Sequence, residues 1–253
     1  MNGNAEEQFE AKLGALRNDA VACVRYSYTL LAIDSSTEPE LCELLNSHAL
    51  FWNTVRSGLQ ASAVIALGRI FEHNRGRNGA NPTLRFAEEH PGIFSRKSLR
   101  DRKLRQGLTE GDAAAYVEDS FEPRQHGFAD LRQRLDEMRN LYEGSVRPIR
   151  NDVFAHAGQL TVKYRDDLFA NLTMRKFERL VVFPLQLWDA LFILFSDGRE
   201  PVVRDAPTLV SEIVAAGVPE YVSTWEHVHA AVSTAAFLES LRPLYPELYQ
   251  PGI

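Results

Sequence analysis

Apolar residues recur at intervals of three or four positions along most of this chain, which is the spacing of amphipathic helices. Residues 5–33 carry the first such stripe, through Phe9, Leu13, Leu16, Val24 and Leu31. A second stripe runs from Glu38 to Glu72, after a break at Asp34-Ser35-Ser36. Thr37 and Glu40 have capping-box spacing, with Pro39 in the first turn. The pattern therefore predicts two long helices joined by a short connection, which favours antiparallel packing.

The rest of the chain has the same period, interrupted by turn-forming residues. The segment 73–82 is rich in Gly, Asn and Pro and is predicted to be a loop, after which Asn81-Pro82 starts a short helix. Further helices are predicted over 95–105 with Ser95 as its cap, from Pro123 to about Gly144-Ser145, after Thr173, over 207–216 and over 219–241. Pro148 is expected to restart or kink the chain, and Ala157-Gly158 to end the short piece that follows.

Strand-like alternation is nearly absent, and its best candidate, Leu160 to Tyr164, has only five residues. The prediction is therefore an all-α, multi-helix up-and-down bundle. With 253 residues, of which 45% are hydrophobic, the chain is near the upper size of one domain, and residues 1–253 are predicted to form a single all-α domain.

Composition favours a cytoplasmic protein. Cys23 and Cys42 have neither disulfide-framework nor zinc spacing, and the N-terminus has no basic and apolar leader pattern. The most apolar run, Leu180 to Phe195, contains Pro184 and Asp189 and is shorter than the roughly 20 residues of a membrane span. We interpret it as a core helix and expect no membrane association.

Charge is unevenly distributed beneath the net value of −6, because residues 51–105 hold 11 basic and 4 acidic side chains. The densest group lies in 95–105. It offers Arg96, Lys97, Arg100 and Lys103 as candidate RNA contacts, since clustered cations bind phosphates. The alternative is a solvated helix face balanced by the acidic segment from Glu110 to Glu122.

Several chemistries lack their residues, since the chain has no phosphate-binding loop, no dinucleotide GxGxxG, no GxSxG elbow and no HExxH. No metal ligands or cofactor are predicted. His227 and His229 are two residues apart in a predicted helix, so they point to different faces and are expected to be surface or packing residues.

The segment Arg150-Asn151-Asp152-Val153-Phe154-Ala155-His156 holds a cation, an amide, a carboxylate and an imidazole within seven residues. On an unbroken helix Asp152 and His156 share a face, so the carboxylate can orient the imidazole. Arg150 lies roughly 120° around that helix from His156, so their contact needs a long side chain, a kink or a second copy of the chain. The alternative is a structural ion pair at a helix end.

This segment resembles the Rx4-6H motif of the HEPN superfamily, with Asn151 at a position that is commonly polar there. The run Ser62 to Phe71 resembles the abortive-infection U-type branch. The resemblance covers about 5–195 and leaves a helical extension of about 205–245. It implies either a metal-independent endoribonuclease, often used in phage defence, or a non-catalytic binding relative.

For the catalytic case, the resemblance implies that Arg147, Arg150, Asn151 and His156 converge in a homodimer. Arg150 would hold the phosphate, His156 would act as general acid or base, Asn151 would donate a hydrogen bond, and Asp152 would orient the histidine.

Overall fold

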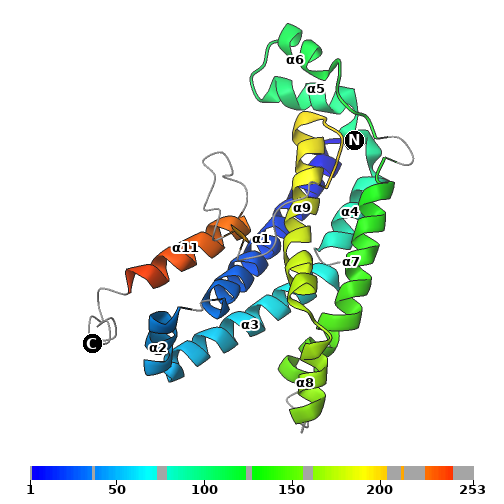
Figure 1. The fold of residues 1–253 in the computed structure, drawn as a ribbon. Coiled ribbons are helices and arrows are strands. Elements are labelled where there is room, and N and C mark those ends of the chain that lie inside the picture. Colours follow the sequence, from blue (N-terminus) through cyan, green and yellow to red (C-terminus); the bar gives the residue numbers. More distant parts are fainter. Residues whose placement is uncertain are drawn as a thin grey trace. The chain divides into compact units, whose positions relative to one another are not determined.

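The computed structural model describes residues 2–35, 38–72, 79–123, 127–155, 162–203, 212–213 and 226–241, and these residues contain no strand. The helices are α1 (Asn2–Asp34), α2 (Pro39–Ser47), α3 (Ala49–Phe71), α4 (Ala80–Glu89), α5 (Arg96–Arg105), α6 (Glu110–Val117), α7 (Ala129–Pro148), α8 (Val162–Ala170), α9 (Met174–Asp197) and α11 (Glu226–Ser240), with short segments η1 (Pro91–Phe94) and η2 (Ile149–Ala155) (Figure 1). The all-α prediction is confirmed.

Contacts divide the chain into two compact units. Unit 1 comprises residues 1–20, 68–147 and 183–205, and unit 2 comprises 21–67, 148–182 and 206–253. Helices α1, α3 and α9 each contribute one part to each unit. The prediction of a single domain over 1–253 stays a prediction.

Unit 1 is centred on an aromatic cluster. Phe9 of α1 lies 5.2 Å, centroid to centroid, from both Phe94 of η1 and Phe195 of α9, and all three are at most 5% exposed. Such edge-on and tilted contacts add to the stabilisation from burying the rings. The cluster therefore fixes the first half of α1 against η1 and the end of α9.

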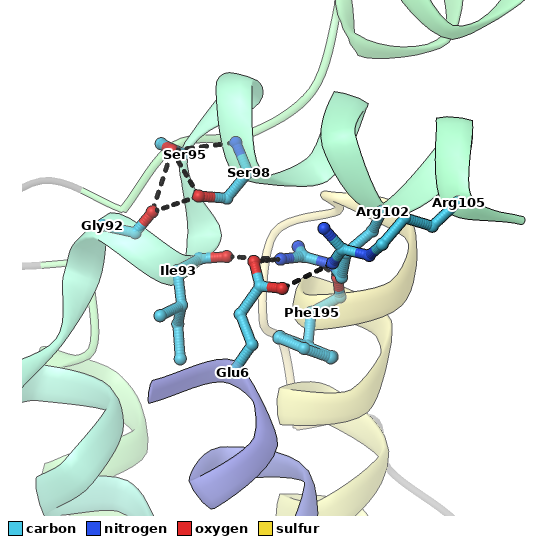
Figure 2. A network of polar contacts seen from close by, with 8 residues as sticks. All are labelled: Glu6, Gly92, Ile93, Ser95, Ser98, Arg102, Arg105 and Phe195. Carbon is cyan, nitrogen blue, oxygen red and sulfur yellow. Dashed lines mark hydrogen bonds and ion pairs between the residues drawn. The ribbon is translucent and has the colours of Figure 1, made fainter. Parts of the chain in front are cut away.

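The buried side chain of Arg102 bonds to three separate segments of unit 1 (Figure 2). Arg102 donates hydrogen bonds of 2.8 Å to Glu6 Oε1 and to the carbonyl oxygens of Ile93 and Phe195. Its guanidinium also lies 4.1 Å from the centroid of the Phe195 ring. Burial lowers the pKa of Arg102 and the neighbouring Glu6 opposes that change, as expected for a desolvated ion pair. One side chain thus ties together α1, η1 and α9.

Unit 2 has a separate apolar core where α11 packs on the other helices. Leu238 of α11 is 1% exposed and clusters with buried residues of α1, α2 and α3, namely Ile33, Leu41, Leu44, Leu45 and Trp52. Polar contacts hold α11 at its start, where Arg25 pairs with Glu226 at 3.1 Å and the ring of His227 packs edge-on against Tyr28. His227 is only 2% exposed, so it is a packing residue.

Two predicted helix boundaries were wrong. The predicted helix over 38–72 is two helices, because the chain breaks at His48, whose φ and ψ are −119° and 40°. The hydroxyl of Ser47 donates to the Leu44 carbonyl there, and such local bonds compete with the helical ladder. The helix predicted to end near Gly144-Ser145 instead continues to Pro148, with Ser145 and Val146 buried.

Leu160 to Tyr164, the best candidate for strand-like alternation in a chain predicted to be all-α, is helical from Val162 onward, as the first turn of α8, while residues 160 and 161 lie outside the described part. The predicted capping box was wrong, because Glu38 rather than Thr37 is the N-cap of α2, its side chain makes no capping hydrogen bond to the helix, and Pro39 follows it. Thr37 lies outside the described residues.

The helix caps at Ser95 and Thr173 are confirmed. The Ser95 hydroxyl accepts from the Ser98 backbone N–H at 3.2 Å, and the Thr173 hydroxyl accepts from the Lys176 N–H at 3.4 Å. Of the two C-terminal helices predicted, the described residues include α11 and the helical pair 212–213.

By length and composition, α9 is the one helix in the described residues that could cross a membrane. Its most apolar window is 56% buried inside the protein, and Leu180, Leu187, Leu191 and Leu194 have no exposed surface. A core helix of a soluble protein passes the same length and composition test, and the burial supports that interpretation.

Candidate functional site

The predicted motif begins where an α-helix changes into a π-helix. Helix α7 ends at Pro148, and η2, a π-helical segment, continues from Ile149 to Ala155. Proline has no backbone N–H and its ring collides with the carbonyl four residues earlier, so the regular ladder cannot pass through Pro148. The wider i→i+5 pattern follows, which is rare and concentrated at functional sites.

Within η2, an apolar side chain is fully buried, whereas the polar side chains that follow it keep some contact with solvent. Ile149 has no exposed surface, whereas Arg150, Asn151 and Asp152 are half-buried. Side chains of this kind are positioned by their packing yet still reachable from solvent, which is the condition for contacting a ligand.

Arg150 and Asn151 are joined directly. The Arg150 guanidinium donates from Nη1 to Asn151 Oδ1 at 3.3 Å. The Asn151 amide oxygen therefore accepts from Arg150, and the amide NH₂ group keeps two donors for another acceptor. A guanidinium and an amide side by side form a donor-rich pair, which suits a phosphate oxygen.

Asp152 has a partner that the sequence analysis did not find. The phenol of Tyr164, in α8, donates to Asp152 Oδ2 at 2.9 Å. The hydrogen bond and the charge of Asp152 raise the pKa of Tyr164, because both favour the neutral phenol. Tyr164 was missed because no helix was predicted between Gly158 and Thr173. The useful indication was the helical spacing from Tyr164 to the buried Leu168.

His156, the predicted acid–base residue, lies outside the described residues, as do Ala157 and Gly158. The structure joins Arg150 to Asn151 and, separately, Asp152 to Tyr164. The position of the imidazole relative to these side chains stays a prediction.

Arg147 is paired along its own helix. It lies in the last turn of α7, its side chain is 52% exposed, and it forms an ion pair and hydrogen bond with Glu143 one turn earlier. That hydrogen bond raises the pKa of Arg147, so the guanidinium keeps its charge under all ordinary conditions. Surface pairs of this type are weak and exchange readily, which leaves Arg147 usable as a phosphate contact.

Three of the four cations proposed as RNA contacts on α5 are engaged within unit 1. Arg96 donates through Nε and Nη2 to the Ser120 carbonyl, at 3.2 Å each. Arg100 pairs with Glu110. Lys103 lies 3.5 Å from Asp197 and 4.2 Å from the centre of the Tyr116 ring.

Lys97 is exposed, and its side chain forms no hydrogen bond or ion pair with the described part of the chain. Two of the α5 partners, Glu110 and Ser120, belong to the segment 110–122, which also supplies Glu122 to the Arg96 backbone N–H. This arrangement favours the alternative interpretation of α5, a helix face balanced by the acidic segment.

A metal site is not seen in the described part of the chain, where no three His, Cys, Asp or Glu side chains gather at ligand distances. Neither Cys23 nor Cys42 forms a disulfide within the described residues.

Comparison with known families supports the resemblance drawn from the motif. A family model described as AbiU2, of the HEPN class, matches residues 6–211. The match includes the whole of η2 and α8, and it ends before α11. Neither the curated proteins nor the solved structures gave a match to this chain.

Proposed function

We propose, from the premise that this chain belongs to the abortive-infection-related AbiU2 family of HEPN proteins, that it is a metal-independent endoribonuclease. The observation that supports this most is the half-buried Arg150–Asn151 pair at the α-to-π transition, directly ahead of His156 in sequence. It supports the proposal because a planar, permanently charged guanidinium can hold a phosphodiester at two points.

The reaction needs only groups that this chain supplies. The RNA 2′-hydroxyl attacks the adjacent phosphorus, forming a bond from O2′ to phosphorus while the bond from phosphorus to O5′ breaks. The 2′-hydroxyl proton passes to a base, and the departing 5′-oxygen receives a proton. The products are a 2′,3′-cyclic phosphate and a 5′-hydroxyl end.

In this scheme Arg150 binds the non-bridging phosphate oxygens and stabilises the charge that builds on them, and Asn151 donates a further hydrogen bond. His156 acts as the general acid or base, a role for which an imidazole suits neutral pH. Asp152 retains capacity for a second donor beside Tyr164, because a carboxylate has about four acceptor positions, and it can orient His156.

The active form is a homodimer with composite sites. Each chain has one Arg150 and one His156 with five residues between them, so a two-fold axis beside η2 would bring the motifs of both chains together.

The test is cleavage of end-labelled single-stranded RNA by the purified full-length chain in EDTA. We expect products with 2′,3′-cyclic phosphate ends, and loss of at least about 100-fold in rate for His156→Ala. A helical spectrum and melting temperature equal to those of the wild type control for folding. Undiminished cleavage by His156→Ala removes this mechanism, and inactivity of the wild type on a broad RNA set favours a non-catalytic binding module.

A further inference from the structure

Unit 2 contains a pocket of about 630 Å³ that is separate from the Arg150 motif. Its walls come from the end of α1, from α2, from the start of α3 and from α11 (Figure 1). Its size falls within the range of roughly 300–1,000 Å³ of small-molecule sites. Because α11 lies beyond the residues 6–211 that match the family, one wall of this pocket is an addition to the family core.

The wall contributed by α11 is held in place by several contacts. Leu238 is buried against α1, α2 and α3, and Arg25 pairs with Glu226 at the start of the helix. The Thr234 hydroxyl lies 3.4 Å from that of Thr29 on α1. These contacts hold α11 against the other helices that line the pocket.

The lining is rich in rings and aliphatic groups. Phe51, Trp52 and Phe237 contribute aromatic rings, and Phe51 and Phe237 remain 60% and 54% exposed. The rings of Phe51 and Trp52 meet edge-on at 5.1 Å. Exposed large apolar side chains gathered around a cavity mark a binding surface.

The polar groups of the pocket are few, and none of them is a carboxylate, an ammonium or a guanidinium. Thr29, Thr234 and Ser233 offer hydroxyls and His48 offers an imidazole, while no Asp, Glu, Lys or Arg lines the cavity. Asp34 and Arg56 lie on the same helices but outside the lining of the pocket. They form an ion pair at 2.8 Å, so their charges compensate each other. A charged ligand group would lose its hydration in such a pocket without gaining a counter-charge.

We infer that this pocket is a binding site for a neutral, mostly apolar small molecule with an apolar or aromatic body and one hydrogen-bonding group. The aromatic rings contact the body, and the hydroxyls of Thr29 and Thr234 bind the polar group. This site does not depend on RNA cleavage, so either proposal can fail without the other.

The test uses the neutral fluorescent probe N-phenyl-1-naphthylamine with the full-length chain. Ser233→Phe places a ring in the pocket from an exposed position of α11. Ala236→Phe is the matched control, since Ala236 is exposed on the same helix and does not line the pocket. We expect saturable binding by the wild type and by Ala236→Phe, and binding weaker by about tenfold or more for Ser233→Phe, because overfilling a site excludes its ligand.

A second arm displaces the probe with dodecanol or with dodecanoate, which differ in charge but share one apolar chain. Dodecanol should compete at least about tenfold more effectively, because the pocket supplies no cation for the carboxylate. Equal binding by the two Phe variants, or no saturable binding by the wild type, overturns the proposal. Equal competition overturns its neutral character. A change in oligomer mass in Ser233→Phe without a change in probe binding would make the pocket a protein interface instead.

Discussion

The phenol of Tyr164 donates a 2.9 Å hydrogen bond to Asp152 Oδ2 and so links α8 to the π-helical segment η2. Asp152 lies between the Arg150–Asn151 pair and His156 in sequence. The bond therefore determines the direction of the carboxylate that is proposed to orient His156, and Tyr164 acts as a positioning residue in that proposal.

Removing the Tyr164 hydroxyl should slow RNA cleavage without altering the fold. In Tyr164→Phe the Asp152 carboxylate loses one donor, so we expect kcat to fall several-fold, well short of the roughly 100-fold loss or more expected for a missing acid–base group. Asp152→Asn should lose at least as much, because it also removes the carboxylate that is proposed to orient His156, and the double variant should be no worse than Asp152→Asn alone. Additive losses would separate Tyr164 from Asp152.

The same hydrogen bond predicts that Tyr164 loses its proton at a higher pH than an ordinary tyrosine. Its raised pKa means that the folded state favours the neutral phenol. The stabilisation is thus fully present below the ordinary tyrosine pKa of about 10 and is lost as the pH rises through the raised value. The absorbance difference at alkaline pH between the wild type and Tyr164→Phe should have its midpoint above about 10. A midpoint below 10 would show that the hydrogen bond is not formed in solution.

Much of the fold could be predicted because burial follows the helical period. The stripes through Phe9, Leu13 and Leu16 and through Leu187, Leu191 and Leu194 are buried in the structure. The break at His48 could not be read from the same pattern, because the apolar spacing continues on both sides and the deciding bond, from Ser47 to the Leu44 carbonyl, is local. Helix α7 passes through Gly144 because its neighbours Ser145 and Val146 are buried.

The site was predictable only in part, for a similar reason. The Arg150–Asn151–Asp152 cluster is a property of neighbouring residues, so its members could be found in the sequence. The contact of Tyr164 with Asp152 spans 12 residues and depends on α8 being a helix. The pairing of Arg100 with Glu110 depends on how α5 and α6 pack, which charge counts alone do not give.

Two glycines should respond to alanine in opposite directions. Gly198 has φ +63°, and a Cβ there would come within 2.5 Å of Leu99 Cδ2 and 2.8 Å of Ser120 Cβ. Gly198→Ala should therefore lower the free energy of unfolding by at least about 1–2 kcal/mol, from the left-handed backbone alone. Gly144→Ala meets no atom within 4 Å inside α7, and it should raise the free energy of unfolding by about 0.5–1 kcal/mol. Urea unfolding of both variants checks the signs.

Arg102 and Arg105 both contact Glu6 but should differ greatly in their effect on stability. The side chains of Arg102 and Glu6 are 7% and 9% exposed, whereas that of Arg105 is 60% exposed. Arg102→Met leaves the Ile93 and Phe195 carbonyls without their donor, and it leaves the buried Glu6 carboxylate paired with Arg105 alone. We therefore expect a loss of about 3–5 kcal/mol in the free energy of unfolding. Arg105→Met should lose at most about 1 kcal/mol. Equal losses in urea unfolding would show that Glu6 is not buried.

RNA affinity should depend on η2 more than on α5. Because Arg96, Arg100 and Lys103 have partners within unit 1, neutralising the exposed Lys97 together with Arg100 should weaken RNA binding by less than about threefold at physiological salt. Arg150→Ala should weaken it more, by about tenfold, because a charge-assisted phosphate contact is lost. Filter binding with a non-cleavable 2′-deoxy substrate measures affinity apart from catalysis. The reverse order would restore α5 as the RNA contact.

The composite site can be tested by mixing two inactive variants. Arg150→Ala and His156→Ala should each abolish cleavage, and Arg150→Lys should restore little, because an ammonium supplies charge without the planar two-point contact of a guanidinium. If two chains share each site, a mixed dimer of the two alanine variants contains one site with an intact Arg150 and an intact His156. At equal mixing about half of the dimers are mixed, each with one of its two sites intact, so about a quarter of the wild-type activity should return. The assay mixes the variants under conditions that exchange subunits, with each variant mixed with itself as the control. A mixture as inactive as its parents, in dimers shown by mass to have exchanged, would place both residues of each site on one chain.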